Sequence, residues 1–367
     1  MPGKKLKRIT IKIGTKVLTD EQNRIDREVI RRLAGQILDL VERKIEVIVV
    51  SSGAVGAGLG LLSLRKKGLS LARLQAAASV GQTRLMDIYN EYFNERGYIA
   101  GQVLLTQEDF NDRERFLNIR YTLNALLEYK AIPVINENDP VSTEEIKCGD
   151  NDRLSSLVAD LSDSDMLIIL SDVDGLYDGD GRVIEHVEAV TGSVKSFCAG
   201  KGSEESTGGM RTKLNAVKNA TQAGIRCVIA RGRRKNVILD IVSGARVGTD
   251  FAVPARTLRA RKRWIAFGIK AKGAVIVDAG AEKALVGKNK SLLPGGIVGV
   301  RGKFSAGDVV EIRNSGLEVI ARGLSNYSSE EVAKIMGKRS DRIEAELGYK
   351  DYDEVIHKDN LVIVEGT

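Results

Sequence analysis

The sequence predicts an α/β protein with a mainly parallel open sheet sandwiched by helices, followed by a small β-barrel-like domain. Short apolar runs of the length of buried strands alternate with segments of helical periodicity. The order strand, helix, strand at this spacing is typical of βαβ units, and hence of parallel pairing. Beyond residue 272 the chain changes to short β-rich pieces separated by glycine turns, which predicts the second domain.

The chain of 367 residues is longer than one hydrophobic core usually serves, so two domains are expected. We predict a first domain at residues 1–255, a basic linker at 256–272 and a second domain at 273–367. The apolar runs are too short to cross a bilayer, and three isolated cysteines indicate reduced thiols. We therefore expect a cytoplasmic protein with no membrane partner. A net charge of +7 would suit anionic ligands or RNA but decides neither.

The elements of the first domain follow from the periodicity of apolar residues. Strands are predicted at residues 8–13, 45–50, 101–105, 132–135, 166–170 and 225–230, and helices at 27–44, 73–96, 116–129, 154–161 and 207–223. In the second domain, strand pieces are predicted at 273–280, 296–302, 308–314, 317–323 and 360–365, with one helical insertion at 329–348.

Ligands of open parallel sheets bind beyond the carboxyl ends of the strands. Three polar clusters are expected at that edge: residues 136–139 (NEND) after one strand, 171–175 (SDVDG) after another, and 149–152 (GDND) between them. Asp150, Asn151 and Asp152 either cap the helix that starts near residue 153 or supply a carboxylate that orients lysines or a metal-bound phosphate. Chemistry is therefore expected along this edge.

Two lysine-containing segments are further candidates for binding an anion. Residues 206–213 (STGGMRTK) do not match a P-loop, yet their glycines would let backbone N–H groups approach a phosphate, with Lys213 about one turn into a helix. The alternative is a glycine-rich loop in which Ser206 or Thr207 only caps that helix. Lys12 lies near the end of the first strand, before a Gly-Thr turn, and is either a ligand-edge lysine or a solvated one.

Other patterns exclude some classes of site. Glycines at 53–58 do not match G-x-G-x-x-G, so we expect no nicotinamide cofactor; they favour either a backbone N–H facing a substrate oxygen or close helix–strand packing. Leu176 and Tyr177 break a calcium-loop pattern that begins at Asp172. With two histidines, a histidine zinc site or a Ser-His-Asp triad is not expected. The basic cluster at 231–235 either meets phosphate or nucleic acid or forms a solvated turn.

Many strings, in order, resemble one known family. IKIGTKVL, VVSSGAVGAG, QVLLT, NDRERFLN, PVINENDPV, GDNDRLS, LSDVDGLY and STGGMRTK resemble the glutamate 5-kinases of the amino acid kinase superfamily, and SLLPGGIVGVRGKFSAGDVVEIRN resembles a PUA domain. The resemblance covers nearly the whole chain. It implies the amino acid kinase fold and transfer of the γ-phosphoryl group of ATP, with Mg²⁺, to the side-chain carboxylate of L-glutamate, the first step of proline biosynthesis.

The resemblance also implies roles for individual residues. Lys12 and Lys213 would stabilise the transferred phosphoryl group, and Asp152 would hold both lysines. Residues expected to bind glutamate are Ser52, Gly53, Asp139 and Asn151. Residues expected to bind ATP are Lys12, Gly14, Ser171, Asp172, Thr207, Gly208, Gly209, Met210, Arg211, Thr212 and Lys213, with backbone contacts from Gly14 and Gly53 to phosphate oxygens. Mg²⁺ would be bound mainly through the ATP phosphates. Because a carboxylate is ionised at pH 7, the reaction needs alignment and charge cancellation and no general base.

Family membership would further imply feedback inhibition by proline through loops at residues 111–118 and 140–148. It would imply a homo-oligomer, either dimer or tetramer, and a possible RNA contact through the PUA domain. Ser206 stands where the family usually has glycine, and Lys16, Arg211 and Cys148 also depart from its common pattern. Two alternatives stay open: a superfamily kinase for aspartate, acetylglutamate, carbamate or UMP, and an RNA-binding protein.

Overall fold

The computed structural model describes residues 6–20, 24–64, 68–142, 150–191, 194, 204–254, 271–288 and 290–364, leaving out the side chains of residues 113, 114, 150 and 204–208. The chain divides into two compact units, Met1–Thr257 and Leu258–Thr367. Most of the predicted basic linker lies outside the described residues. Among the described helices, none is both long and apolar enough to cross a membrane.

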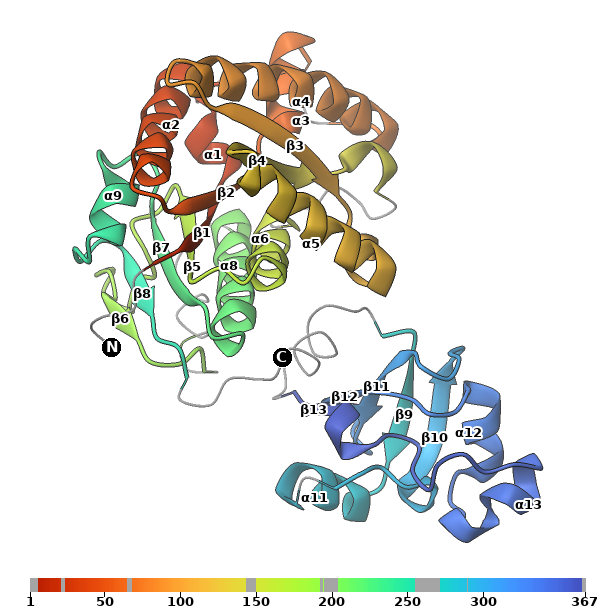
Figure 1. Ribbon diagram of the computed structural model, residues 1–367. Helices are drawn as coiled ribbons and strands as arrows, with labels where there is room; N and C mark the ends of the chain where they lie inside the picture. Colours follow the sequence, from red (N-terminus) through yellow and green to blue (C-terminus); the bar gives the residue numbers. More distant parts are fainter. Residues whose placement is uncertain are drawn as a thin grey trace. The chain divides into compact units, whose positions relative to one another are not determined.

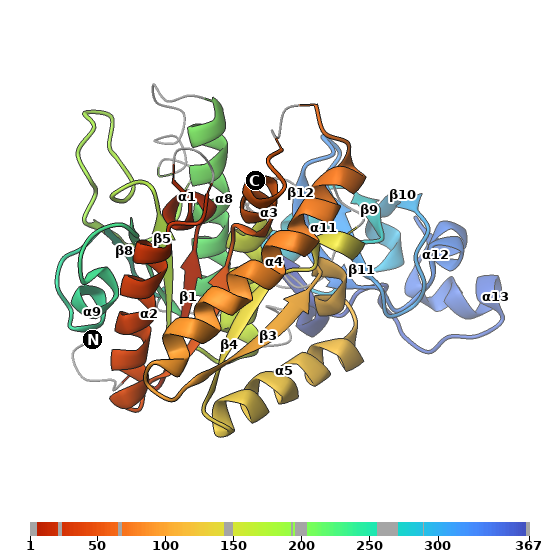
Figure 2. The ribbon, with the colours of Figure 1, turned by 90° about the horizontal axis from the view of Figure 1, so that it is seen from above.

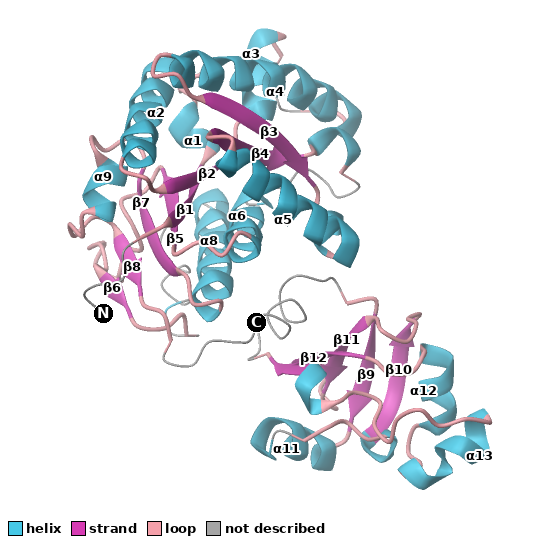
Figure 3. Ribbon diagram, in the orientation of Figure 1, coloured by secondary structure: helices cyan, strands magenta, loops and turns pink. Residues whose placement is uncertain are grey.

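The first unit is built on an eight-stranded sheet with the order β3-β4-β2-β1-β5-β7-β8-β6 (Figure 3). Its pairs are parallel except β7 with β8. The strands are β1 Arg8–Ile13, β2 Glu46–Ser51, β3 Ile99–Leu105, β4 Ala131–Glu137, β5 Met166–Ser171, β6 His186–Val187, β7 Arg226–Arg231 and β8 Thr249–Phe251. The helices are α1 Thr15–Leu18, α2 Arg27–Glu42, α3 Ala54–Leu61, α4 Leu71–Asn94, α5 Arg113–Glu128, α6 Asp150–Leu161, α8 Glu204–Gln222 and α9 Val237–Val242, with 3-10 turns η1 Gln107–Phe110 and η2 Asp139–Val141.

Helices cover both faces of this sheet (Figure 1). On β1, Ile9, Ile11 and Ile13 face one side and pack with apolar residues of α2, α4 and α9. Helices α5, α6 and α8 supply the apolar residues that pack against the other face. Figure 2 shows β1 between α2 and α8. Strands buried on both faces explain the near-continuous apolar runs of the sequence, and the predicted sandwich is confirmed.

Helices α3 and α4 pack at very short range. A Cβ atom built on Gly58 would lie 1.7 Å from the carbonyl oxygen of Ala77, and one built on Gly81 would lie 1.9 Å from that of Ala54. Only a residue without a Cβ fits at either position. Close packing therefore applies at Gly58, but its partner is the helix α4 and not a strand, as the sequence interpretation had it.

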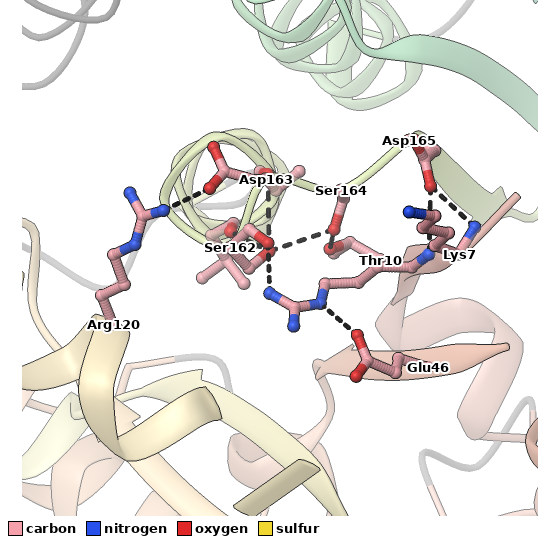
Figure 4. Close-up of polar contacts among 11 residues, drawn as sticks. Lys7, Thr10, Glu46, Arg120, Ser162, Asp163, Ser164 and Asp165 are labelled. Carbon is pink, nitrogen blue, oxygen red and sulfur yellow. Dashed lines mark hydrogen bonds and ion pairs between the residues drawn. The ribbon is translucent and has the colours of Figure 1, made fainter. Parts of the chain in front are cut away.

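A polar network ties the far end of α6 to β1 (Figure 4). The Thr10 hydroxyl bonds that of Ser164 at 2.8 Å, and Ser164 bonds Ser162 at 3.0 Å, all buried. The backbone N–H of Arg8 donates to Asp165 at 3.1 Å. Because α6 ends at Leu161, these bonds fix its carboxyl end to the strand that carries Lys12.

The second unit holds a five-stranded sheet with the order β10-β9-β11-β12-β13. Its strands are β9 Gly273–Val277, β10 Ile297–Gly302, β11 Val309–Arg313, β12 Val319–Leu324 and β13 Leu361–Ile363. Its helices are α11 Ala279–Lys288, α12 Ser329–Ile335 and α13 Ile343–Leu347, with 3-10 turns Pro294–Gly296, Ser340–Arg342 and Lys358–Asn360. Apolar residues from the strands and helices share one core.

Two expectations for the second unit were incomplete. Helix α11 was not predicted, because its ten residues show no clear apolar face; the Asp278 carboxylate starts it by accepting from the N–H of Ala281 at 2.7 Å. The helical insertion predicted at 329–348 is present and divides into two helices, since Gly337 has a φ of 75° and follows the end of α12.

Candidate functional site

A buried carboxylate joins two distant lysines at the carboxyl end of the central strands. Lys12 Nζ lies 2.7 Å from Asp152 Oδ1, and Lys213 Nζ lies 3.2 Å from Asp152 Oδ2. Asp152 is fully buried and Lys12 is 5% exposed. The solvated-lysine alternative for Lys12 is therefore wrong.

Local structure explains this convergence. Lys12 shares the face of β1 that carries Thr10, and Asp152 lies in the first turn of α6, which packs on that face. Thr212, beside Lys213 on α8, donates its hydroxyl to Asp152 Oδ2 at 2.8 Å. Lys213 Nζ also donates to the carbonyl of Gly209 at 3.2 Å, and Thr212 Oγ1 lies 2.9 Å from the same oxygen. Both oxygens of the carboxylate are thus occupied by cations or donors.

The electrostatics of Asp152 are set by its two cations. Burial alone would raise the pKa of its carboxyl group, but the charges of Lys12 and Lys213, with the hydroxyl of Thr212, outweigh that effect. The pKa of Asp152 is therefore lowered, and the side chain is a carboxylate at neutral pH. Of the two interpretations of residues 150–152, that of a carboxylate orienting lysines is the one that describes Asp152.

Gly14 and the residues after β5 border this cluster. The N–H of Gly14 donates to the carbonyl of Leu170 at 3.0 Å. This N–H group already has a hydrogen-bond acceptor, so the structure gives no support for the expected contact between it and a phosphate. A Cβ at Gly14 would lie 3.5 Å from Lys12 Nζ. After β5, Ser171 donates to Asp172 at 3.1 Å, and Asp172 lies 3.3 Å from Lys16 Nζ.

On the other side of Asp152, side-chain amides join the ends of β2 and β4. Asn151 Nδ2 donates to Ser52 Oγ at 3.0 Å and to Asn136 Oδ1 at 2.9 Å. Ser52 and Asp139, both expected to bind glutamate, are buried. Gly53, with a φ of 102°, turns the chain between β2 and α3, a conformation that glycine adopts without strain. The four residues expected to bind glutamate thus lie on segments next to the lysine cluster.

The predicted helix that contains the glycine-rich segment is confirmed. Residues 207–213 lie inside α8, which begins at Glu204, three residues before the predicted start. The Met210 side chain packs on the core beside β5 and β7, and Arg211 is exposed. The side chains of Ser206 and Thr207 lie outside the described residues.

Arginines of the basic cluster after β7 form ion pairs with acidic side chains of the same unit. Arg231 bonds both oxygens of Asp174, at 2.7 and 3.1 Å. Arg233 lies 2.7 Å from Asp26. These arginines are already paired, which favours the interpretation as a solvated turn.

The sequence arguments missed two residues, Asn136 and Gln82. Asn136 joins Asn151 to Gln82, whose Oε1 accepts from Asn136 Nδ2 at 2.7 Å. Asn136 stands in the polar cluster after β4, so its position was a signal. Gln82 lies in the middle of α4, where only its spacing from Gln75 and Tyr89 could have drawn attention.

The part of the chain that the structure describes holds no group of three or more His, Cys, Asp or Glu side chains able to bind a metal. Asp152 uses both oxygens on lysines and Thr212. Mg²⁺ is usually held by one or two carboxylates together with substrate phosphates, so binding of such an ion does not require a group of this kind.

Comparisons with known proteins agree with the two units. Residues 7–231 match the model of the amino acid kinase family, and residues 273–347 match that of the PUA domain. The chain is 49% identical over 364 residues to a glutamate 5-kinase of Caldanaerobacter subterraneus subsp. tengcongensis and 46% identical to one of Thermoanaerobacter sp., covering 98% of both chains in each comparison. A solved UMP kinase from Bacillus anthracis has a TM-score of 0.48 and 16% identity over 69% of this chain and 98% of its own, too distant to add to these matches.

Proposed function

The chain belongs to the glutamate 5-kinase family of amino acid kinases, and we propose that the Asp152 cluster is where it transfers a phosphoryl group to the side-chain carboxylate of L-glutamate. It phosphorylates glutamate for proline biosynthesis. The observation that carries the site assignment is the contact of Lys12 and Lys213 with opposite oxygens of one buried carboxylate.

The chemistry of the transfer explains why two lysines are needed. The acceptor carboxylate and the γ-phosphate of ATP are both anionic, so they repel each other as they approach. Two ammonium groups, that of the buried Lys12 and that of the partly buried Lys213, are held at fixed positions by Asp152 and cancel this charge without having to reorganise during the reaction. Mg²⁺, bound through the phosphates, would neutralise the charge of the β- and γ-phosphate oxygens.

The substrates divide between two sides of Asp152 in this proposal. ATP would lie on the side of Ser171, Asp172 and α8, with Lys213 on its phosphates. Glutamate would lie beside Ser52, Asp139 and Asn151, where the charge of Asp139 matches its ammonium group. The site is thus assembled from the ends of β1, β2, β4 and β5.

Hydroxylamine trapping tests the function, because glutamyl 5-phosphate reacts to give a hydroxamate that can be measured. We expect hydroxamate formation that requires ATP, Mg²⁺ and glutamate together. A panel of aspartate, acetylglutamate, carbamate and UMP separates the related kinases, and glutamate should be the best acceptor. A folded protein that forms ADP with one of those acceptors, and none with glutamate, would contradict the proposal.

Other expectations remain proposals. The loop at 140–148, proposed to take part in inhibition by proline, lies mostly outside the described residues. The PUA domain would supply an RNA contact, and the protein would be a cytoplasmic homo-oligomer. Proline titration of the trapping assay, salt-dependent RNA binding and light scattering test these three points separately.

A further inference from the structure

We propose that helix α4 positions the glutamate side of the site through Gln75, Gln82 and Tyr89, which thereby set the affinity for the acceptor and not for the nucleotide. This inference rests on the proposed function, because it needs glutamate to bind beside Ser52, Asp139 and Asn151. The three side chains act through other residues and are therefore positioning residues.

The three residues are spaced by sevens along α4, which is close to two helical turns, so they lie on one side of the helix. Each one makes a hydrogen bond to a different segment outside α4. These bonds are Gln75 Nε2 to the carbonyl of Ser142 at 3.2 Å, Asn136 Nδ2 to Gln82 Oε1 at 2.7 Å, and Tyr89 Oη with Ser51 Oγ at 3.1 Å.

Every segment that α4 holds in this way adjoins a residue expected to bind glutamate. Ser51 precedes Ser52 in the chain, Asn136 bonds Asn151, and Ser142 follows the turn η2 that contains Asp139. None of the hydrogen bonds described for α4 reaches Lys12, Asp152 or Lys213. A shift of α4 should therefore move the residues expected to bind glutamate more than it moves Lys12, Asp152 or Lys213.

The orientation of the amide chain is fixed by a backbone group. The N–H of Glu137, which can only donate, bonds Asn136 Oδ1 at 2.9 Å, so Asn136 must present its NH₂ group to Gln82. Gln82 then presents Oε1 to Asn136, and its Nε2 is buried with no hydrogen-bond partner among the described residues. An unpaired buried donor lowers stability, so packing alone does not account for a glutamine at this position.

Steady-state kinetics of the full-length protein test the inference, with glutamate varied at saturating ATP and ATP varied at saturating glutamate. For Gln82→Leu we expect KM for glutamate to rise about tenfold, as for a lost buried hydrogen bond, and KM for ATP to stay within about twofold. Gln82→Leu removes an unpaired buried donor, which should raise stability, and a buried hydrogen bond, which should lower it. The two effects on the free energy of unfolding therefore oppose each other.

Tyr89→Phe gives a second variant with a smaller change of structure. Burial raises the pKa of Tyr89 to about 12, so at neutral pH the substitution removes one neutral hydroxyl and no charge. It should raise KM for glutamate about threefold or more without changing KM for ATP. If Gln82→Leu does not fold, Tyr89→Phe decides the result.

Two variants of α4 serve as matched controls. Thr83→Val removes a hydroxyl whose bond at 3.4 Å stays within the helix, and Ile88→Val trims a buried methyl group. Both should leave KM for glutamate unchanged. If Ile88→Val raises it as much as Gln82→Leu does, the effect is general loosening and the inference fails. The inference also fails if the wild type is active and both Tyr89→Phe and every folded Gln82 variant keep its KM for glutamate. If the wild-type protein itself forms no hydroxamate, the proposed function is overturned as well.

Discussion

Lys12 and Lys213 bind opposite oxygens of the Asp152 carboxylate, with Nζ atoms at 2.7 Å from Oδ1 and 3.2 Å from Oδ2. One lysine comes from the first strand of the sheet and the other from a helix near the end of the first unit. A carboxylate shared in this way holds two like charges close together that would otherwise repel each other. Their proximity is the physical basis of the proposed phosphoryl transfer.

Lys213→Ala and Lys12→Ala should each lower kcat by about 10² or more, since each removes a donor that stabilises charge in the transition state. The trapping assay at saturating ATP and glutamate measures this. Lys218→Ala, five residues further along α8, is a matched control that should retain activity. Near-normal turnover in both site variants would refute the assigned roles.

Asp152→Asn should lower the free energy of unfolding by about 3 kcal/mol at pH 7, because it leaves two lysines without their buried counter-charge. The folded-state pKa of Asp152 lies below its ordinary value of 3.8, so its stabilisation is present above that pH and is lost as the pH falls through the lowered pKa. The difference between wild type and variant should therefore narrow below pH 3.8. Urea unfolding at several pH values checks this, and a constant difference would contradict it.

Gly58→Ala and Gly81→Ala should each destabilise the protein by about 2 kcal/mol or more, because the added methyl group would overlap a backbone carbonyl of the neighbouring helix. Gly35→Ala in α2 is the opposite case. Its Cβ would meet no atom within 4 Å, so alanine should stabilise the helix by about 0.5 kcal/mol. Thermal unfolding of the three variants measures both the expected losses of stability and the expected gain. Equal effects at positions 35 and 81 would be incompatible with the close α3–α4 contact.

Thr10→Val removes the hydroxyl that ties Ser164 to β1 and keeps the side-chain shape. We expect a loss of about 1 kcal/mol of stability, typical of one buried hydrogen bond. Because Asp152 remains bound to both lysines at the opposite end of α6, kcat should change little. A large fall in kcat without a change in stability would show that the far end of α6 controls the site more directly than these contacts indicate.

The alternation of strands and helices in the first unit was visible in the sequence, because strands buried on both faces need continuous apolar runs. Lys12 and Asp139 stood out for a related reason: they end or follow such runs, where ligands of parallel sheets bind. Asn151 and Asp152 stood out as part of the polar cluster between two of these runs. Boundaries were less well determined. Helix α8 starts at Glu204 and α11 was missed, since glycines and weak apolar periodicity hide helices that tertiary contacts stabilise.

By itself the sequence determined the alternation of the main strands and helices, the family resemblance and the residue types available for chemistry. Only the tertiary structure decided that Asp152 holds both lysines, that the N–H of Gly14 is already bonded to Leu170, and that Gln82 supports Asn136. The physical reason is that periodicity records which face of an element is buried. Which distant side chains meet across that buried face depends on how the strands and helices pack.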